Sequence, residues 1–557
     1  MKWHGFAAVT LVVLGGCALG PPRPATGVVD VTVLAINDFH GNIQTPPGKL
    51  AILDPSNPAS PLRVEAGGSE TLATVVKQAR AANPNSIFVA AGDLIGASPL
   101  ISAHYHDEPT VEALSLMGLD LSAVGNHEFD EGRAELLRMQ KGGCHARDKC
   151  QTGHRFKGAS YRYLAASTID VTTGRPVLPA YAIRKFDGVP VAFIGLSLAG
   201  TSDLVSPAGV AGLRFQNEIE TVNALVPKLR AKGVEAIVVL IHEGGRQAGD
   251  YSDPNACAGM SGPILAIVNG FDKAVDVVIT GHTHRPYNCE VDGRLVTSAD
   301  KFGSVVSNIS LKIDRATREV IEAKADNMIV RVDAYAKDAA QTALVGAYAR
   351  LIQPVADREI GELKVTLSNV QAANGDSEIG NQLADAFIAA MENDARGKSV
   401  IAFVNTGGIR ESLVPTPDGK VTYGAVFAVQ PFDNKVVAQD LTGTEIATLL
   451  EQQWLNQSYP KIMLVSQGFS YTWDVSMPDG QRVVPGSIRL YGQPVETGAT
   501  YRVALNSFMG EGGDGYTVLK NGRNKTFGMA DVDALEAWIA RQKVVQPGPL
   551  DRIRRLN

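Results

Sequence analysis

Five short apolar runs constrain this chain most, because each of them leads directly into a residue that can hold a metal ion. The runs cover residues 28–36, 86–91, 121–124, 234–241 and 275–280. Continuous runs of Val, Ile and Leu next to glycine are typical of strands that are buried on both faces of an α/β sheet. In open sheets of this kind, functional sites form beyond the carboxyl ends of the strands. We therefore expect the residues after the five runs to meet at one edge of the fold.

These following residues are rich in metal ligands. The runs are followed by Asn37-Asp38-Phe39-His40, Gly92-Asp93, Gly125-Asn126-His127-Glu128-Phe129-Asp130, His242-Glu243-Gly244 and Gly281-His282-Thr283-His284-Arg285. Carboxylate, amide and imidazole groups suit borderline divalent cations such as Zn²⁺, Mn²⁺ and Co²⁺. Any one motif alone is equally well a helix-capping residue or a core histidine. All five in register favour a metal site.

The first residues are typical of an export signal. Lys2 gives a positive start to an apolar stretch at 6–14, which is shorter than the roughly 20 residues that span a bilayer. The stretch ends in Leu14-Gly15-Gly16-Cys17, which resembles the lipobox of bacterial lipoproteins, where lipid is attached to the cysteine. The proline-rich residues 21–24 suit an extended tether. We expect an exported protein anchored to the cell envelope through Cys17, on the periplasmic or outer-membrane side; a soluble periplasmic protein is the alternative.

Cysteine usage agrees with export. Setting Cys17 aside leaves an even number of cysteines: Cys144, Cys150, Cys257 and Cys289. Four cysteines allow three pairings, and we favour the two in which each cysteine pairs with its nearest neighbour in sequence. A zinc site of the first two with His145 and His154 is the alternative, but its spacing fits no standard finger. An oxidising compartment favours disulfides.

Composition limits the class of partner. The chain has 557 residues, 45% of them hydrophobic and 20% charged, which is typical of a globular protein with more than one domain. Its formal net charge is −6, and no basic stripe is present. This balance argues against nucleic-acid polymers as partners, but not against a small anionic substrate. The oligomeric state is not indicated.

The pattern of the sequence changes near residue 330. Before it, apolar runs alternate with helical stretches at 70–82 and 217–232. A helical segment at 333–352 follows, and we expect Pro354 to end it. A second mixed region then holds a predicted helix at 378–391 and predicted strands at 399–404 and 500–505. The expected organisation is a signal peptide at 1–16, a tether at 17–28, a first domain at 29–330, a linker helix at 331–357 and a second domain at 358–550.

Taken together, the five motifs resemble the calcineurin-like metallophosphoesterase pattern. With Phe129-Asp130 and the second region, the whole mature chain resembles the bacterial and animal 5′-nucleotidases, including the periplasmic UDP-sugar hydrolases. The resemblance implies an α/β fold with an N-terminal four-layer α/β/β/α sandwich, a linker helix and a C-terminal α+β substrate-binding domain. It also implies two divalent ions, with Zn²⁺ or Mn²⁺ favoured and Co²⁺ an alternative.

The resemblance also implies roles in the metal site. The first ion is expected on Asp38, His40, Asp93 and His284, and the second on Asp93, Asn126, His242 and His282. Two ions about 3.5–4 Å apart clamp phosphoryl oxygens and activate a water, so one carboxylate must bridge them, and Asp93 fits. His127 is expected to stabilise the developing charge or protonate the leaving group, and Asp130 to orient its ring. The alternative for Asp130 is a helix-start residue.

In the second region, substrate contacts are expected by the same resemblance. Asn405-Thr406-Gly407-Gly408-Ile409-Arg410 resembles the family's Asn-Gly-Gly-Gly-Ile-Arg, in which the arginine clamps phosphate. Phe432 and Phe508 are expected to sandwich the base, although each alone would more often be a core residue. Asn405, Asn434 and Asp514 are expected to contact the nucleoside. The family's second phosphate-binding arginine, just upstream of residues 374–381, is missing, which puts phosphate affinity in doubt.

The resemblance implies metal-dependent hydrolysis of nucleoside 5′-phosphates by activated water, extending to nucleotide sugars or dinucleotides. A 2′,3′-cyclic phosphodiesterase/3′-nucleotidase and a nucleotide pyrophosphatase share the same core and stay open as alternatives. A related sulfur-oxidation hydrolase is disfavoured by the two phenylalanines, since a small sulfur substrate has no base to stack. A non-catalytic, lipid-anchored surface binding protein is disfavoured by the complete ligand set.

Overall fold

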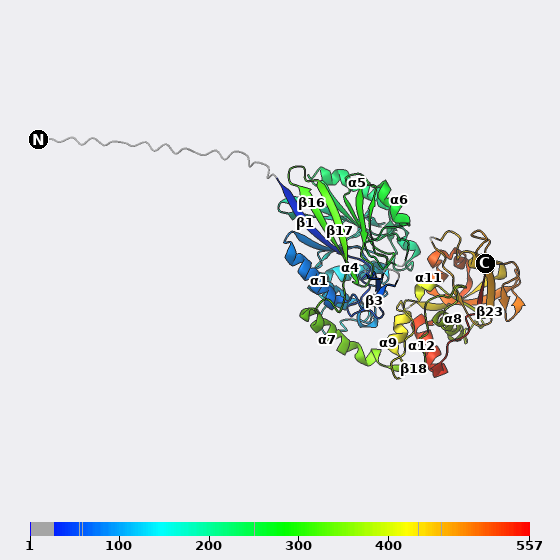
Figure 1. Ribbon diagram of the computed structural model, residues 1–557. Helices are drawn as coiled ribbons and strands as arrows, with labels where there is room; N and C mark the ends of the chain where they lie inside the picture. Colours follow the sequence, from blue (N-terminus) through cyan, green and yellow to red (C-terminus); the bar gives the residue numbers. More distant parts are fainter. Residues whose placement is uncertain (2–26, 55, 58–59, 250, 433, 458) are drawn as a thin grey trace.

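The computed structural model describes residue 1 and residues 27–557, apart from residues 55, 58, 59, 250, 433 and 458 (Figure 1). Cys17 and the predicted signal peptide, apart from residue 1, lie outside the described residues. In the part of the chain that is described, no helix is both long and apolar enough to cross a membrane.

Two six-stranded sheets form the centre of the first domain (Figure 1). The first sheet has the order β17 (Val320–Ile329), β16 (Val305–Asp314), β1 (Val28–Ile36), β4 (Ser86–Ala90), β5 (Leu121–Ala123) and β6 (Arg162–Leu164). The second has the order β14 (Tyr287–Val291), β15 (Arg294–Ser298), β13 (Val277–Thr280), β12 (Ala236–Ile241), β10 (Val189–Leu196) and β9 (Tyr181–Phe186). The five predicted strands correspond to β1, β4, β5, β12 and β13. The first and last residues of each strand lie within two residues of the predicted ones.

Burial on both faces explains why these strands are continuously apolar. In β1, Val33 and Ala35 belong to the core between the two sheets, whereas Leu34 and Ile36 belong to the core under the helices. Helices α1 (Ser69–Ala82), α3 (Glu108–Met117), α5 (Glu218–Arg230) and α6 (Pro263–Gly270) supply the outer layers. The predicted four-layer α/β/β/α arrangement is confirmed.

Helix α7 (Ala339–Ala356) leads from the first domain to the second along the lower edge of Figure 1. The predicted start at residue 333 is wrong, because the Asp338 side chain caps the helix by accepting the N–H of Ala340 and of Gln341. The prediction that Pro354 ends the helix is also wrong. Pro354 lies in the last turn, where its missing N–H forfeits a single hydrogen bond, and the helix continues to Ala356.

The second domain is built on a five-stranded sheet. Its order is β22 (Leu464–Val465), β19 (Ile401–Val404), β26 (Thr500–Asn506), β21 (Lys435–Thr442) and β27 (Arg523–Ala530). One face packs on α8 (Glu378–Ala390), α9 (Tyr423–Val429) and α12 (Asp531–Gln542), the other on α10 (Gly443–Glu451) and β23 (Phe469–Asp474). The chain is thus a two-domain α/β protein, as expected from the sequence.

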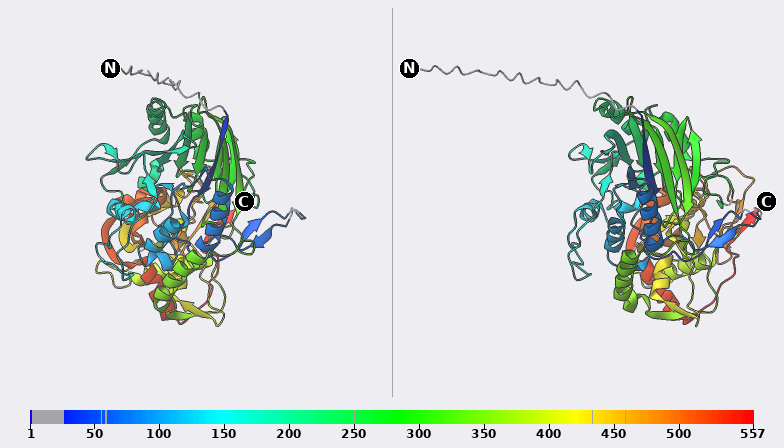
Figure 2. Two further views of the ribbon diagram at one scale, coloured as in Figure 1. Left: turned by 90° about the vertical axis from the view of Figure 1, so that its left-hand side faces the viewer. Right: turned by 60° about the vertical axis from the view of Figure 1, so that its left-hand side comes forward.

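Shorter elements complete the fold. In the first domain they are β2 (Leu50–Ile52), β3 (Leu62–Val64), α2 (Leu100–Ala103), η1 (His127–Phe129), α4 (Arg133–Lys141), β7 (Thr168–Asp170), β8 (Arg175–Pro176), η2 (Ala199–Asp203) and β11 (Leu213–Phe215). In the second they are β18 (Glu359–Leu363), η3 (Thr406–Gly408), β20 (Lys420–Thr422), β24 (Arg489–Leu490), β25 (Gln493–Pro494), α11 (Ser507–Gly510), η4 (Gly513–Gly515), η5 (Thr517–Asn521), β28 (Val544–Val545) and β29 (Ile553–Leu556). Figure 2 shows the β2–β3 hairpin standing away from the body of the first domain.

Two disulfides close loops of the first domain. Cys144 pairs with Cys150, with 4.7 Å between their Cα atoms, and Cys257 pairs with Cys289, with 5.3 Å between theirs. This is the favoured pairing of nearest neighbours. The alternative zinc site is wrong, because both of its cysteines are used in the first disulfide.

Candidate metal centre and substrate cavity

The side chains after β1, β4, β5, β12 and β13 meet at one edge of the first domain. The structure brings together all of the predicted ligands: Asp38, His40, Asp93, Asn126, His242, His282 and His284. Two groups form, each with its ligand atoms within 4.8 Å of one another: Asp38 with His40 and His284, and Asp93 with His242 and His282.

The first group offers two imidazole nitrogens and one carboxylate oxygen to a common point. The Nε2 atoms of His40 and His284 lie 3.0 Å apart, and the Nε2 of His284 lies 3.3 Å from Oδ1 of Asp38. The Nδ1 of His40 contacts the carbonyl oxygen of Gly96 at 2.8 Å. A proton on Nδ1 donates there, which leaves the lone pair of Nε2 directed into the group, as a metal ligand requires.

The second group repeats this arrangement. The Nδ1 of His242 contacts the carbonyl oxygen of Ala91 at 2.8 Å, and its buried Nε2 is directed into the group, 2.9 Å from Oδ2 of Asp93. The Oδ1 of Asn126 lies 3.1 Å from Nδ1 of His282. A nitrogen of His242, a nitrogen of His282 and the amide oxygen of Asn126 thus lie close together, where a divalent cation would contact all three.

Asp93 joins the two groups. Its Oδ2 lies 2.9 Å from Nε2 of His242 and 3.8 Å from Nε2 of His40. Its Oδ1 accepts the backbone N–H of His127 at 2.9 Å. A carboxylate between two sets of nitrogen ligands is what two closely spaced ions need, so the residues present fit a pair of divalent cations.

Burial keeps most of the ligand histidines neutral. It lowers the pKa of His282 to about 3 and holds the pKa values of His40 and His284 well below the ordinary value. His242 differs, because burial lowers its pKa but the charge of Asp93 outweighs this and raises the pKa to about 10. In the protein without metal, a proton on His242 occupies the position of a cation, so metal binding must release it.

The ligands sit on unusual backbone. Left-handed φ angles occur at Asp38 (50°), His40 (45°), Asp93 (49°), His282 (71°) and His284 (53°). Such conformations cost a non-glycine residue about 1–3 kcal/mol each and persist only where the surroundings enforce them. Their clustering at these ligands indicates that the strand ends are shaped for the site.

Glu128 is a buried residue of this site to which the sequence analysis gave no role. Its carboxylate accepts the backbone N–H groups of Asp93 at 3.0 Å, Leu94 at 2.8 Å and Gly125 at 2.7 Å. It therefore ties the loop after β4 to the loop after β5. Burial, reinforced by the charge of Asp93, raises the pKa of Glu128 to about 7. Its position inside the Gly-Asn-His-Glu motif was the available signal.

His127 lies beside the metal ligands but is held differently. Its Nδ1 is 2.7 Å from Oδ2 of Asp130, as expected from the sequence. Burial lowers the pKa of His127, but Asp130 and Asp93 outweigh this and raise it. Its ring stacks on Phe432 with the ring centroids 5.7 Å apart. Its ligand atom also lies within 4.8 Å of those of His40 and Asp93, so proximity alone leaves a direct metal contact open.

A cavity of about 1250 Å³ separates the metal edge from the second domain. The first domain lines it with Asp93, Asn126, His127, Asp130, His282 and His284. The second domain lines it with all of the predicted substrate residues: Asn405, Arg410, Phe432, Asn434, Phe508 and Asp514. Residues from both halves of the chain therefore face one space.

Arg410 is the second-domain residue that acts on the metal edge. Burial is the main cause of the low pKa values of His40 and His284, and the charge of Arg410 lowers them further. Its guanidinium carbon lies 5.7 Å from the centre of the Phe432 ring, which itself stacks on His127. The loop after β19 thus places a cation opposite the metal ligands.

Two of the other predicted contacts, Asn405 and Asp514, belong to one hydrogen-bond network. The Nδ2 of Asn405 donates to Oδ2 of Asp514 at 2.7 Å, and Asn506 donates to Oδ1 of Asn405 at 2.9 Å. Lys461 donates to Oδ1 of Asp514 at 3.0 Å. This network fixes the orientation of the amide and carboxylate groups at the cavity wall.

Three further lining residues escaped the sequence analysis. Lys301 lines the same cavity as Arg410, and burial, with the charge of Arg410, lowers the pKa of Lys301. Lys301 follows β15 at the same sheet edge as the ligands, so the rule of strand ends would have flagged it. Arg246 of the first domain stacks on Tyr459 of the second, with its guanidinium carbon 4.4 Å from the ring centre. No local pattern links those two residues.

Known proteins share both halves of this architecture. Calcineurin-like phosphoesterases match residues 31–286, and the 5′-nucleotidase C-terminal domain matches residues 359–521. Cell wall protein Lmo0130 of Listeria monocytogenes is 30% identical over 585 residues, which cover 98% of this chain and 72% of that protein. The solved 5′-nucleotidase precursor of Thermus thermophilus superposes with a TM-score of 0.75 at 26% identity, covering 95% of this chain and 99% of that one.

A third relative is longer than this chain. Endonuclease YhcR of Bacillus subtilis is 32% identical over 521 residues, which cover 92% of this chain but only 40% of the relative. The two proteins therefore share this two-domain unit and not their whole architecture.

Proposed function

This chain belongs to the 5′-nucleotidase family, in which a calcineurin-like phosphoesterase domain precedes a 5′-nucleotidase C-terminal domain, and from that premise we propose that it hydrolyses nucleoside 5′-phosphates with two divalent ions. Metal-dependent phosphoester hydrolysis is the activity of the family. The nucleotide substrate and the pair of ions are the proposal. The observation that carries it is the position of Asp93 between two ligand groups, at the wall of a cavity that the second domain also lines.

Seven residues would hold the ions. We assign Asp38, His40, Asp93 and His284 to one, and Asp93, Asn126, His242 and His282 to the other. Bound there, divalent ions supply charge neutralisation at the phosphoryl group and activation of water at neutral pH. Nitrogen and oxygen ligands suit Zn²⁺ or Mn²⁺ and admit Co²⁺.

His127 would handle the proton of the leaving group. Asp130 occupies its Nδ1, so Nε2 is the nitrogen left to face the substrate. The raised pKa of His127 favours the protonated ring that a general acid requires. Asp130 would act by fixing the orientation of this ring.

Two cations would bind the phosphate from opposite domains. The guanidinium of Arg410 suits the planar arrangement of phosphoryl oxygens. Lys301 of the first domain lines the same cavity. It would take the place of the second phosphate-binding arginine that the sequence lacks near Gly375.

Phe432 and Phe508 would stack on the base, since both line the cavity and neither is fully buried. Stacking contributes about 1–3 kcal/mol per base and tolerates any base. Asn405, Asn434 and Asp514 would bind the polar groups of the nucleoside. Nucleotide sugars and dinucleotides extend the proposed range, because the cavity is large for a mononucleotide alone.

We also propose that the protein is exported and anchored by lipid on Cys17. The sequence of residues 1–17 supports this proposal. The two disulfides are compatible with an oxidising compartment. Mass spectrometry of the purified membrane fraction tests it: an N-terminal peptide that begins with a lipidated Cys17 is expected, and an unmodified cysteine would contradict it.

A second candidate is cleavage of nucleic-acid phosphodiesters. The similarity to endonuclease YhcR favours it, whereas the net charge of −6 opposes it. The cyclic phosphodiesterase, pyrophosphatase and sulfur-oxidation alternatives keep the same metal core and differ only in substrate.

A substrate panel tests the proposal. Metal-loaded enzyme is incubated with AMP, ATP, UDP-glucose, NAD, 2′,3′-cyclic AMP, thiosulfate and a single-stranded RNA, and product formation is measured for each. The expected result is the highest kcat/KM for a nucleoside 5′-phosphate, and none for Asp93→Ala. Cleavage of RNA without release of phosphate from AMP would make the protein a nuclease, and turnover of none would make it a binding protein.

A further inference from the structure

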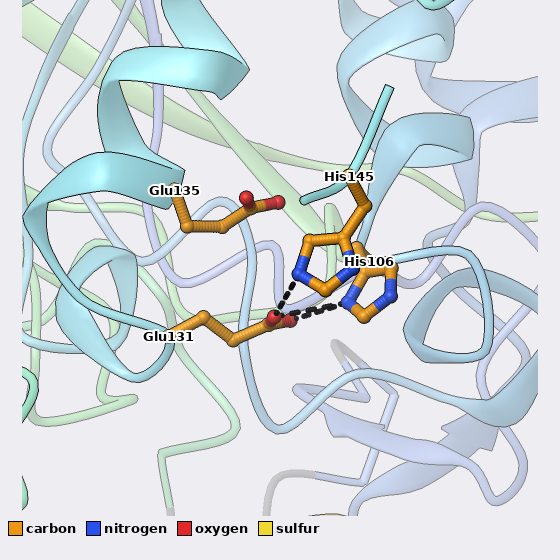
Figure 3. A group of neighbouring side chains, drawn as sticks. All are labelled: His106, Glu131, Glu135 and His145. Carbon is orange, nitrogen blue, oxygen red and sulfur yellow. Dashed lines mark hydrogen bonds and ion pairs between the residues drawn. The ribbon is translucent and has the colours of Figure 1, made fainter. Parts of the chain in front are cut away.

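A second cluster of ligand-type side chains lies in the first domain, apart from the proposed catalytic pair (Figure 3). Its members are His106, Glu131, Glu135 and His145, and each offers one ligand atom within 4.8 Å of the others. They come from three segments: the loop before α3, the stretch from η1 into α4, and the loop closed by the first disulfide. Most of them also line the active-site cavity.

The Glu131 carboxylate contacts one nitrogen of each histidine (Figure 3). Its carboxylate oxygens are both 2.9 Å from Nδ1 of His106, and Oε2 is 3.6 Å from Nε2 of His145. Ligands about 2.0–2.2 Å from a tetrahedral zinc ion are separated from one another by roughly 3.3 Å. The observed separations lie on either side of this value, so small side-chain shifts suffice to admit an ion.

Asp148 contacts the opposite side of both rings. Its Oδ2 lies 2.9 Å from Nε2 of His106 and 3.2 Å from Nδ1 of His145. Metal-bound histidines typically donate their second N–H to such a carboxylate, which fixes the tautomer and aims the other nitrogen at the ion. The backbone N–H of Asp148 lies 3.1 Å from the same Nδ1 of His145. Nδ1 of His145 can either accept this N–H or donate a proton to the Asp148 carboxylate. A cation bound to Nε2 would favour donation to the carboxylate, because it requires the ring proton to be on Nδ1.

The cluster is held in place by bonds outside it. His145 and Asp148 lie in the loop closed by the Cys144–Cys150 disulfide. Reciprocal backbone hydrogen bonds between His145 and Lys149, of 3.2 and 3.0 Å, narrow this loop further. The two imidazoles stack with their centroids 3.7 Å apart. The ligand positions are therefore constrained before any ion arrives.

The charge of the cluster also favours a cation. Glu135 is paired with Arg138, whose Nε lies 2.9 Å from both carboxylate oxygens, but Arg138 also bonds to Glu108. The single positive charge of Arg138 is thus shared by the two carboxylates of Glu135 and Glu108. Glu131 adds a further negative charge to the cluster.

We propose that His106, Glu131, Glu135 and His145 form a separate binding site for a divalent cation of the zinc class. Two nitrogens and two carboxylates are a donor set that Zn²⁺ accepts. The ion would bind the disulfide-closed loop to the start of α4 at the cavity wall. The competing account is an ion-pair network in which a protonated His106 takes the place of the metal.

Zinc stoichiometry of the full chain tests the proposal. The wild type and the variants are equilibrated at a buffered concentration of free Zn²⁺, and their metal content is measured by mass spectrometry. The wild type is expected to hold one more ion per chain than Glu131→Gln or His145→Ala. Asp148→Asn should keep the site with roughly 10–100-fold weaker affinity. His154→Ala is the matched control, because this exposed histidine pairs only with Glu112 outside the cluster.

A second set of measurements uses the Asp93→Ala variant, which is expected to lack the two catalytic ions. This keeps the test independent of the proposed function. Asp93→Ala should still bind one Zn²⁺ per chain, and adding His145→Ala should remove it together with any zinc-induced rise in Tm. Equal zinc content in the single and double variants, with no change in Tm, would overturn the proposal and leave the ion-pair network.

Discussion

The wall of the cavity that the first domain supplies is shaped by its backbone, whereas the wall from the second domain is shaped by side chains. At the metal edge, ligands such as Asp38 and His284 occupy left-handed conformations, and Glu128 binds three backbone N–H groups. In the second domain, Asn405 and Asp514 are fixed by side-chain hydrogen bonds, and of the predicted substrate residues only Asp514 has a left-handed φ, of 58°.

This difference has a consequence for substitution. A ligand at the end of a buried strand has no neighbour that can move into its place, because loop and strand are fixed together. A residue in a side-chain network can be replaced while the others keep their contacts. We therefore expect all-or-none effects at the metal edge and graded effects across the cavity.

The largest effect is expected at Asp93. Asp93→Ala removes the carboxylate shared by both ligand groups, so the catalytic pair of ions and all hydrolysis should be lost together. Metal analysis and phosphate release from AMP measure the two properties. Asp203→Ala, at an exposed aspartate of the same domain, is the control. Two catalytic ions and near-normal activity in Asp93→Ala would contradict the assignment.

His127→Ala should separate chemistry from metal binding. If the ring protonates the leaving group, kcat should fall by roughly 10²–10⁴-fold while both catalytic ions remain. Steady-state kinetics and metal analysis of the same sample check this. Loss of an ion would instead make His127 a ligand, which its distance to His40 and Asp93 permits.

Phe432→Ala and Phe508→Ala should give the graded effect of the second wall. Losing one stacking contact of about 1–3 kcal/mol corresponds to a rise in KM for AMP of roughly 5–150-fold. The KM for p-nitrophenyl phosphate should barely change, because that substrate has no nucleoside. Phe527→Ala, whose side chain is exposed, is the matched control. Equal damage to both substrates would mean that the rings serve the core.

The smallest expected effects concern the pH dependence of stability. One carboxyl group in each domain is involved, and the two contributions change with pH in opposite directions. Burial raises the pKa of Asp276 in the first domain to about 7, so its stabilising contribution is present below about pH 4 and is lost as the pH rises towards 7. The hydrogen bond from Arg523 lowers the pKa of Glu445 in the second domain to about 2, so its contribution is present above about pH 4.5 and is lost as the pH falls towards 2.

Thermal unfolding at several pH values measures both contributions. Asp276→Asn should flatten the dependence of Tm on pH between about 4 and 7, and Glu445→Gln should flatten it between about 2 and 4.5. An unchanged slope in either variant would show that the carboxyl group has the same pKa folded and unfolded.

The metal edge could be predicted from sequence because its signals are local. A continuous apolar run predicts a doubly buried strand, and the polar residue that follows must lie at the strand end. The bounds of α7 differ from the prediction for local reasons. Apolar residues at helical spacing begin upstream of the helix, but the capping residue Asp338 sets its start. Proline is tolerated near a helix end, so Pro354 does not set the end.

Other parts could not be predicted because only tertiary contacts create them. His145 was considered with His154 and two cysteines nearby in sequence, whereas the structure groups it with His106 and Glu131. The disulfide uses both cysteines, and His145 lines the cavity. Arg246 and Tyr459 are likewise more than 200 residues apart in sequence, and no spacing rule relates them.

Anomalous diffraction from crystals grown with Mn²⁺ tests the central claim most directly, because it locates the ions without relying on activity. The account predicts two peaks about 3.5–4 Å apart at the edge of the first domain, with the Asp93 carboxylate between them. A single peak, or two peaks with Asp93 bound to neither or only one, would contradict the dinuclear centre on which the proposed hydrolysis depends.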